Sequence, residues 1–233
     1  MSNSNNNTSD VIKEIERVSP GVVSEAFQYQ AAILADVNGR RGAMNGRIQG
    51  LSPKMKMAGP AFTVEVRPGD NLMIHAALAL AKPGDVLVID GKGDLSAALM
   101  GTIMMTQAET LGLAGVIVDG AVRDAEEIRE MGYPVFAAGT NPNGPTKLVP
   151  GRVNWPVSVG GVTVRPGDLV VADFDGVVVI EKEKAEGLLP LAAKKHADET
   201  ARIEGIKSGK QLRPSWLEKT LVAAGVLKEG EVL

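Results

Sequence analysis

The sequence predicts an α/β protein built on a mixed β-sheet. Short apolar runs rich in Val and Ile alternate with segments of helical periodicity, which is typical of α/β folds. The last apolar runs follow one another too closely for crossover helices, so we expect them to pair as antiparallel hairpins. With 233 residues, of which 44% are hydrophobic, the chain is long enough for one main domain with a sizeable core.

The N-terminal part is expected to be helical and to pack against the outside of that core. Residues 11–18 have apolar side chains at helical spacing, Ser19-Pro20 ends the pattern, and a second helix is expected over residues 22–34. Residues 38–57 are rich in Gly, Asn and Arg and are expected to form a loop that borders a site or a subunit contact. We interpret its arginines as solvent-facing, namely Arg40, Arg41 and Arg47.

Beyond Gly59 the pattern changes to short runs typical of β-strands. Helices are expected between several of them, at residues 71–81, about 101–111 and 124–131. Three Pro-Gly-Asp tripeptides, which end at Asp70, Asp85 and Asp168, are interpreted as structural turns because proline presets a turn and glycine adopts positive φ. The expected strands are residues 61–66, 85–90, 115–119, 134–137, 161–164, 169–173 and 177–180.

The C-terminal segment is expected to be helical, over residues 181–207 and 214–226. A long charged helix after the last strand has few contacts left in its own domain, so we expect it to reach over a neighbouring subunit. The chain is therefore divided into a disordered Ser/Asn-rich tail (1–10), N-terminal helices and a loop (11–57), an α/β core that carries the site (58–181), and C-terminal helices with oligomer contacts (182–233).

The composition excludes several classes of function. A net charge of −3, with basic residues interspersed among acids, provides no basic surface for nucleic acid. The absence of cysteine excludes disulfides, thiolate nucleophiles and zinc–thiolate sites, and two histidines leave any metal to be bound mainly by oxygen. Because the N-terminus is polar and no apolar run reaches the length of a membrane span, we expect a cytoplasmic protein without membrane contact.

The first candidate site lies at the end of the run that begins at Gly115. This apolar run is expected to be a buried strand, and Arg123 and Asp124 follow it directly. Loops at strand ends aim side chains into the crevice where open α/β sheets bind ligands. An arginine fork suits a carboxylate and an aspartate offers hard oxygen to a divalent cation, so the pair suits a small metal-chelating acid. The competing interpretation is a solvated turn or helix start.

A second candidate feature is the glycine-rich stretch at 91–101, which leads into the expected helix. A helix start presents unpaired N–H groups and the positive end of the helix dipole, which together can bind an anion. The amides from Gly101 to Met104 would supply those donors. The competing interpretation is a glycine-rich β-to-α connection without a ligand.

Three sequence blocks together indicate a family. The blocks GDLSAALMG at 93–101, GVIVDGAVRD at 115–124 and RPGDLVVADFDGVVVI at 165–180 resemble the RraA-like family, whose enzymatic members are 4-hydroxy-4-methyl-2-oxoglutarate and 4-carboxy-4-hydroxy-2-oxoadipate aldolases. The resemblance spans roughly residues 18–209. It implies a layered α/β/β/α sandwich like the phosphohistidine swivelling domains, a trimer or a hexamer of two stacked trimers, a divalent metal, Mg²⁺ or Mn²⁺, and a pyruvyl substrate.

The resemblance also implies roles for individual residues. The substrate would be bound by backbone amides at the glycine-led helix start, and an arginine would hold its pyruvyl group. An aspartate would bind the metal, a lysine would lie in a later loop, and a glutamate would reach in from the adjacent subunit. The corresponding positions here are Gly101, Thr102, Ile103 and Met104 for the amides, then Arg123, Asp124, Lys147 and Glu199.

Position 102 departs from the aldolase pattern. The aldolases carry an aspartate twenty-one residues before the arginine, whereas this chain has Thr102. A hydroxyl group neither holds negative charge nor relays a proton near neutral pH as a carboxylate does. This departure affects the proton-handling part of an aldolase site and leaves the binding of metal and keto acid intact.

These residues lead to the hypothesis of metal-assisted cleavage of a carbon–carbon bond in a 2-oxo acid. The cation would chelate the carboxylate and keto oxygen, and the released electrons would collect as a pyruvate enolate stabilised by the metal and Arg123. Retro-aldol cleavage of a 4-hydroxy-2-oxo acid and decarboxylation of oxaloacetate share this electron sink. Decarboxylation needs no base for a hydroxyl group and so tolerates Thr102 better.

Two alternatives remain open. A Schiff-base aldolase would use Lys92 or Lys147 as the nucleophile and would need no metal. A regulatory protein that binds and inhibits RNase E is the alternative from a different class, because some relatives have that role. The remaining conspicuous side chains, His75, Trp155 and Trp216, are interpreted as packing residues.

Overall fold

The computed structural model describes residues 10–210 and 212–233. The chain divides into two compact units, Met1–Ala192 and Ala193–Leu233. Of the tail predicted at residues 1–10, all but Asp10 lies outside the described residues. No helix in the described part of the chain is long and apolar enough to cross a membrane.

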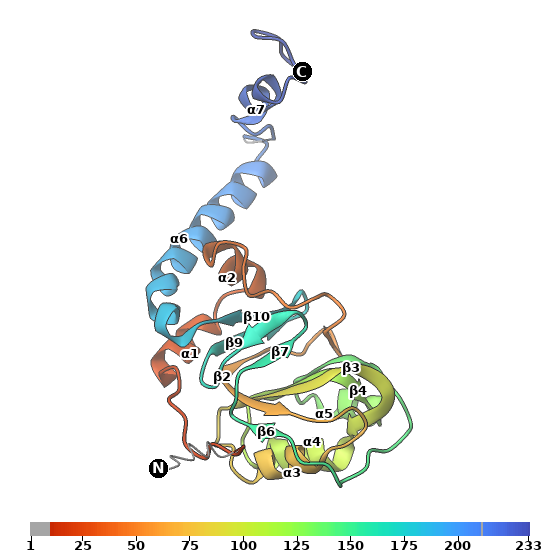
Figure 1. Cartoon of the computed structure of the whole chain (residues 1–233). Coiled ribbons are helices and arrows are strands. Elements are labelled where there is room, and N and C mark those ends of the chain that lie inside the picture. The colour runs from red at the N-terminus through yellow and green to blue at the C-terminus, as the bar shows by residue number, and fades with distance from the viewer. Residues whose placement is uncertain (1–9, 211) are drawn as a thin grey trace, which may run out of the picture. The chain divides into compact units, whose positions relative to one another are not determined.

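An eight-stranded mixed sheet forms the centre of the first unit (Figure 1). Its parallel part consists of β2 (Met57–Glu65), β3 (Val86–Met100), β4 (Gly115–Val122) and β5 (Val135–Thr140). The antiparallel additions are β1 (Gln49–Gly50), β6 (Arg152–Val153), β9 (Leu169–Asp173) and β10 (Gly176–Ile180). The strands β7 (Val157–Val159) and β8 (Val162–Val164) form a separate antiparallel pair.

Strand β2 connects the parallel and antiparallel parts of the sheet. Its residues 57–60 pair with β9, whereas its residues 61–65 pair with β3. Every residue of β2 before Glu65 is buried, as expected for a strand covered on both faces. The predicted mixed sheet and the antiparallel pairing of the late strands are therefore confirmed.

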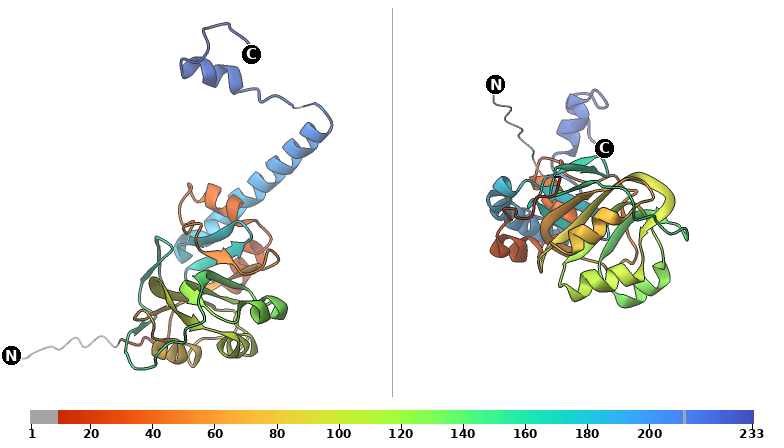
Figure 2. Two further views of the ribbon diagram at one scale, coloured as in Figure 1. Left: turned by 90° about the vertical axis from the view of Figure 1, so that its right-hand side faces the viewer. Right: turned by 60° about the horizontal axis from the view of Figure 1, so that its bottom comes forward.

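Helices cover the sheet on both sides (Figures 1 and 2). One group, α3 (Leu72–Leu78), α4 (Thr102–Thr110) and α5 (Ala125–Met131), packs beside the parallel strands with a large apolar core between them. The other side carries α1 (Pro20–Ala26), α2 (Ala31–Val37) and the beginning of α6 (Lys182–Lys207), which share a second apolar cluster with β9 and β10. This arrangement is the predicted layered α/β architecture.

The three Pro-Gly-Asp turns have the predicted backbone conformation. Their glycines have φ values of 72°, 87° and 85° at Gly69, Gly84 and Gly167. Each aspartate is buried and accepts at least one backbone N–H group. Asp85, for example, accepts the Lys82 amide and two hydrogen bonds from the Arg17 guanidinium at 2.7 and 2.8 Å. The carboxylates thus tie separate segments of the core together.

The helix predicted over residues 11–18 is wrong, because this segment is extended. Its backbone pairs with distant segments: the Ile12 amide donates to the Val153 carbonyl in β6 at 3.1 Å, and the Val18 amide donates to the carbonyl of Gly167, in the turn before β9, at 3.0 Å. The helix expected over residues 22–34 is divided into α1 and α2, and the Ala31 amide at the start of α2 donates to Asp173 Oδ2 at 2.8 Å. Hydrogen bonds to residues far away in the sequence therefore determine the backbone conformation here, although the apolar residues have helical spacing.

One further expectation needs correction, and another gains a contact that was not predicted. Residues 91–100, predicted as a connection, continue strand β3 through several register shifts up to Met100. Arg47 is exposed, as predicted, and it also donates from Nη1 and Nη2 to the two carboxylate oxygens of Asp119, whose side chain is almost completely buried. The loop at 38–57 is thereby fixed to strand β4.

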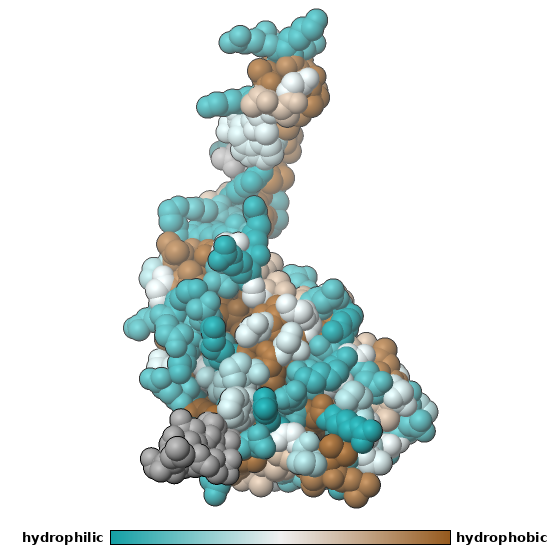
Figure 3. Space-filling model, in the orientation of Figure 1, coloured by the Kyte–Doolittle hydropathy of each residue, from teal (hydrophilic) through white to brown (hydrophobic). Residues whose placement is uncertain are grey.

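The second unit contains the last turns of α6 and the helix α7 (Leu217–Ala223), which has no buried residue. Trp216 is exposed, so its prediction as a packing residue is wrong. In the first unit, hydrophilic side chains cover most of the face drawn in Figure 3, with apolar patches between them. The described residues include large exposed apolar side chains such as Ile103 and Leu148.

Candidate active site

The site is built where three neighbouring parallel strands end at the same level. Met100 of β3 is opposite Val122 of β4, and Val122 is opposite Thr140 of β5. The ladder continues one step into the loops, because the Arg123 amide donates to the Met100 carbonyl at 3.0 Å and the Asn141 amide to the Val122 carbonyl at 2.9 Å. The register therefore brings the segments that begin at Gly101, Arg123 and Asn141 side by side.

Arg123 and Asp124 pack against the glycine that begins α4. A Cβ atom added to Gly101 would lie 2.4 Å from Asp124 Oδ2 and 2.9 Å from Arg123 Cγ, so only glycine leaves room for both side chains. Arg123 Nε lies 3.6 Å from the same oxygen, and both side chains remain partly exposed. Asp124 has a left-handed backbone (φ 56°, ψ 38°), which is uncommon outside glycine and is often found at functional sites.

The amides at the start of α4 are only partly available. The Thr102 N–H donates to Asp124 Oδ2 at 3.1 Å, whereas the Met104 and Met105 N–H groups close the first helical turn onto the Gly101 carbonyl. The Ile103 N–H has no acceptor among the residues that the structure describes. The predicted amide site is therefore reduced mainly to Ile103, because Asp124 already occupies the Thr102 donor.

Glu127, which was not predicted from the sequence, lies beside Thr102. The Thr102 hydroxyl donates to Glu127 Oε2 at 3.0 Å. Glu127 is in the first turn of α5, three residues after Asp124, and residues three apart on a helix lie on neighbouring positions of one face. This spacing was the signal in the sequence, since a helix starting after Asp124 directs both carboxylates toward the same edge of the sheet.

The loop after β5 carries Lys147 and is held by a buried carboxylate. Asp70 Oδ2 accepts the Thr146 hydroxyl at 2.6 Å and the Leu148 amide at 2.7 Å. Burial alone would raise the pKa of Asp70, but these hydrogen bonds outweigh it and keep that pKa below its usual value. Lys147, exposed between the two anchored residues, is thereby fixed at its backbone.

The same loop passes Arg123 at Gly144. An added Cβ at Gly144 would lie 3.1 Å from Arg123 Nη1, so the guanidinium lies between this loop and the start of α4. The structure thus brings Gly101, Thr102, Ile103, Arg123 and Asp124 together and connects them with the loop of Lys147. The side chain of Met104 is buried, so this residue faces the core.

Glu199 lies in the second unit, where it is paired with Lys195 at 2.9 Å. Its contribution to the site of an adjacent subunit stays a prediction. His75, on α3, is half-buried, and its Nε2 atom has no hydrogen-bond partner among the described residues. Trp155 is also half-buried, with the Arg152 guanidinium 5.0 Å from its ring centre.

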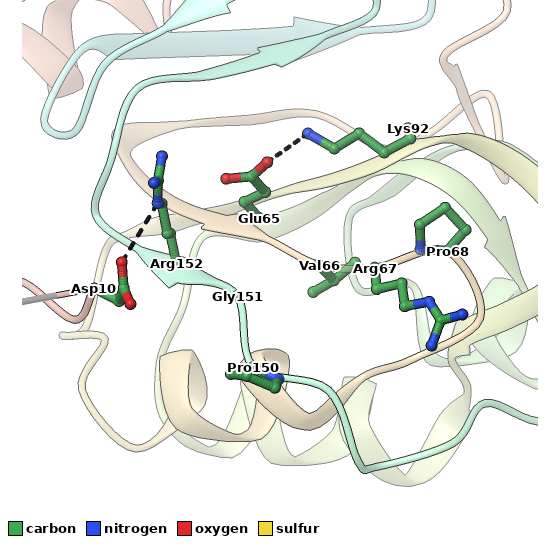
Figure 4. A pocket seen from close by; sticks show the side chains of 9 residues that line it. All are labelled: Asp10, Glu65, Val66, Arg67, Pro68, Lys92, Pro150, Gly151 and Arg152. Carbon is green, nitrogen blue, oxygen red and sulfur yellow. Dashed lines mark hydrogen bonds and ion pairs between the residues drawn. The ribbon is translucent and has the colours of Figure 1, made fainter.

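A groove of about 500 Å³ lies further along the same loop, and Lys92 is the only residue proposed for catalysis that lines it (Figure 4). Lys92 Nζ is bound to Glu65 at 2.8 Å and to Asp90 at 2.7 Å. Burial alone would lower the pKa of Lys92, but the two carboxylates outweigh it and raise that pKa above its usual value. A Schiff-base lysine needs the opposite shift, which argues against Lys92 as a nucleophile.

The carboxylate oxygens at the site suit a hard cation that takes most of its ligands from water or from the substrate. Both contacts of the Asp124 carboxylate involve Oδ2, so Oδ1 remains available as a ligand. No group of three or more His, Asp or Glu side chains gathers as a metal cage in the described part of the chain. Mg²⁺ commonly binds through one or two carboxylates plus water and substrate oxygens, so these residues fit it.

Comparison with known proteins decides the family. The model of the RraA-like family, described as aldolase/RraA, matches residues 9–179. This chain belongs to the RraA-like family. It is 43% identical to a protein of Halalkalibacterium halodurans provisionally named 4-hydroxy-4-methyl-2-oxoglutarate aldolase, over 76% of this chain and 85% of that protein.

Solved structures of RraA-like proteins share the fold. Streptomyces coelicolor RraAS2, described as an unusual member of the RNase ES inhibitor RraA protein family, is 31% identical, with a TM-score of 0.74 over 81% of this chain and 99% of that one. An uncharacterized protein from Pseudomonas syringae pv. tomato is 28% identical, with a TM-score of 0.75 over 85% of this chain and 98% of that one. One relative is thus named as an enzyme, and another is described as a member of a ribonuclease inhibitor family.

Proposed function

We propose that this protein is a divalent-metal-dependent lyase that cleaves a carbon–carbon bond of a 2-oxo acid and releases pyruvate. The observation that carries the proposal is the convergence of Arg123 and Asp124 on the glycine-led start of α4. The relative from Halalkalibacterium halodurans, named for an aldolase reaction, supports lyase chemistry.

In this proposal the chain's residues bind and orient the acid. The Arg123 guanidinium donates to the substrate carboxylate, and the Ile103 N–H provides a further donor at the same edge. Asp124 would hold Mg²⁺ or Mn²⁺, directly or through water, through the carboxylate oxygen that does not accept the Thr102 amide. When bound, the cation would supply electron withdrawal from the keto group of the chelated acid.

Lys147 would approach the substrate from the loop that Asp70 holds. Its ammonium group is a mobile point charge, suited to the distal carboxylate of a diacid. The fixed backbone on either side of Lys147 limits where that charge can reach. We therefore assign Lys147 to binding of the substrate rather than to imine formation.

Two reactions fit this arrangement. Decarboxylation of oxaloacetate needs only the bound acid and an electron sink, whereas retro-aldol cleavage of a 4-hydroxy-2-oxo acid also needs an acceptor for the hydroxyl proton. Thr102 alone is no such acceptor. Oxaloacetate and a 4-hydroxy-2-oxo acid are therefore both tested as substrates. Decarboxylation of oxaloacetate requires fewer catalytic groups of the site.

The experiment measures pyruvate release from oxaloacetate after treatment with EDTA and after addition of Mg²⁺, with the enzyme-free rate subtracted. The proposal expects activity to be lost with the chelator and restored by the metal. Borohydride trapping of a keto acid on the protein, together with EDTA-resistant activity, would instead establish the Schiff-base mechanism.

We further propose a homo-oligomer, a trimer or a hexamer, in which Glu199 of one subunit completes the site of the next. The exposed charged helix around Glu199 and the exposed apolar side chains of Ile103 and Leu148 support it, since such surfaces are commonly covered in assemblies. Light scattering of the purified protein measures the oligomeric state. A monomer at micromolar concentration would contradict this part of the proposal.

A non-catalytic regulator that binds a ribonuclease is the second candidate. The structural similarity to RraAS2 and the replacement of an acidic residue by Thr102 favour it. A pull-down with RNase E, performed beside the pyruvate assay, distinguishes the two functions. Binding to RNase E without pyruvate release would support the regulator.

A further inference from the structure

The hydrogen bond between Thr102 and Glu127 joins two helix starts that both border the candidate active site. Thr102 is the first residue of α4, and Glu127 lies in the first turn of α5. The Thr102 Oγ1–Glu127 Oε2 distance of 3.0 Å shows the hydroxyl donating its proton to the carboxylate. The oxygen lone pairs of Thr102 therefore remain free to accept a second proton.

Retro-aldol cleavage creates a need for such an acceptor. As the bond between C3 and C4 breaks, the hydroxyl group on C4 becomes a carbonyl group and releases its proton. A threonine hydroxyl cannot keep that proton, because it has no basic form near neutral pH, but a carboxylate can.

Two carboxylates contact Thr102 in the described structure. Asp124 Oδ2 accepts the Thr102 backbone N–H and lies 3.6 Å from Arg123 Nε, and Asp124 is itself the proposed metal ligand. Glu127 instead accepts the Thr102 side chain. Glu127 is therefore the carboxylate that contacts the Thr102 hydroxyl group, and a substrate hydroxyl can approach that same group.

We propose that Glu127, through the Thr102 hydroxyl, accepts the proton of the substrate's 4-hydroxyl group in retro-aldol cleavage. The inference rests on the proposed lyase function and names its second substrate class, 4-hydroxy-2-oxo acids. The substrate hydroxyl gives its proton to Thr102 Oγ1 while the Thr102 proton passes to Glu127 Oε2. The electron pair of the C3–C4 bond goes to C3, giving the enolate of pyruvate, which then takes a proton from water, and the resulting hydroxide takes the proton from Glu127.

The test compares two reactions of the same protein, retro-aldol cleavage of 4-hydroxy-4-methyl-2-oxoglutarate and decarboxylation of oxaloacetate. Only the first releases a hydroxyl proton. The variant Glu127→Gln keeps the size and a hydrogen-bond acceptor but is not basic. We expect the ratio of the cleavage kcat to the decarboxylation kcat to fall by about 100-fold, a typical contribution of general base catalysis.

Matched variants separate this role from a structural one. Glu126→Gln, on the same exposed turn of α5, should leave the ratio of the two reactions as in the wild type. Thr102→Val should lower the ratio as Glu127→Gln does, because it interrupts the relay. Thr102→Asp in the Glu127→Gln background should restore the ratio by placing a carboxylate at position 102 itself.

A binding measurement gives a readout that does not depend on turnover. Oxalate has no 4-hydroxyl group. Its affinity in the presence of Mn²⁺, measured by calorimetry, should therefore change less than about threefold in Glu127→Gln. A lost contact of 1.4 kcal/mol would change that affinity about tenfold. A larger loss of oxalate affinity would show that Glu127 shapes the binding site and would overturn the proposal.

The outcomes of the two reactions are distinguishable. If Glu127→Gln slows both equally, the relay is wrong while the lyase function stands. Decarboxylation without any retro-aldol cleavage in the wild type also overturns the relay and leaves the lyase function in place. If the wild type catalyses neither reaction, the proposed function fails, and the relay with it.

Discussion

The Thr102 amide nitrogen lies 3.1 Å from Asp124 Oδ2, so the start of α4 and the end of β4 are joined through one carboxylate oxygen. The same oxygen is only 2.4 Å from the position of a Cβ atom on Gly101. The proposed metal ligand is thus fixed by a backbone donor and by the absence of a side chain next to it.

Replacing Gly101 by alanine should therefore damage the site more than the fold. The added methyl group must displace Asp124 or Arg123, and misplacement of a catalytic group by about 1 Å can cost on the order of 100-fold in rate. Pyruvate release measures the loss. Gly46→Ala is the matched control, because nothing lies within 4 Å of its added Cβ; equal activities of the two variants would contradict the prediction.

Replacing Asp70 by asparagine should loosen the loop that carries Lys147. The amide group cannot accept all the donors that Oδ2 binds, and hydrogen bonds to a charged group contribute roughly 1.5–3 kcal/mol. We expect a lower free energy of unfolding in urea at pH 7 and a higher KM for diacid substrates. An unchanged KM would show that the loop does not contact the substrate.

The stabilisation that Asp70 provides should depend on pH with a defined sign. Because the folded protein holds the pKa of Asp70 below its unfolded value of about 3.9, this stabilisation is present above that value and is lost as the pH falls through the lower, folded pKa. Denaturant titrations from pH 7 down to pH 3 should show the wild type and Asp70→Asn converging in acid. A constant difference would contradict the assignment.

The ion pair between Arg17 and Asp85 should contribute most of the stability of the extended N-terminal segment. Arg17→Ala leaves a buried carboxylate without its cation, which typically costs about 3 kcal/mol. Lys82→Ala removes a pair with Glu14 in which both side chains are largely exposed, and should have no measurable effect. Urea denaturation at pH 7 compares the two, and similar midpoints for both variants would contradict the prediction.

Mixed oligomers test whether Glu199 acts in a neighbouring subunit. Arg123→Ala and Glu199→Ala should each be nearly inactive alone, but co-refolded mixtures should regain activity, because some sites then combine an intact Arg123 with an intact Glu199 from the next subunit. Pyruvate release from the mixture measures this. No recovery, in mixtures shown by light scattering to exchange subunits, would contradict a shared site.

Much of the first unit could be predicted from the sequence, because its strands are continuous apolar runs that only a covered sheet buries. The strand at 169–173 matched its prediction residue for residue. The helix predicted over residues 11–18 was wrong for a physical reason. The apolar spacing fits a helix, but N–H groups of this segment pair with distant segments, which local periodicity does not reveal.

The candidate site could be predicted at the level of segments but not of contacts. Arg123 and Asp124 were recognisable after an apolar strand, since strand ends carry ligands in α/β folds. The contact of Glu127 with Thr102 depends on where two helices begin relative to each other, and the capture of Arg47 by Asp119 depends on a loop path. The spacing of Asp124 and Glu127 indicates that both carboxylates lie at the same edge, but it does not reveal the contact with Thr102, and no pattern in the sequence reveals the pairing of Arg47 with Asp119.

Steady-state pyruvate release from oxaloacetate in Mg²⁺, compared between the wild type and Arg123→Ala, examines the binding of the 2-oxo acid most directly. The guanidinium is expected to hold the substrate carboxylate at the start of α4, so the variant should lose about 100-fold or more in kcat/KM once the enzyme-free rate is subtracted. Equal values for the two proteins would show that this arginine and the glycine-led helix start do not form a catalytic site.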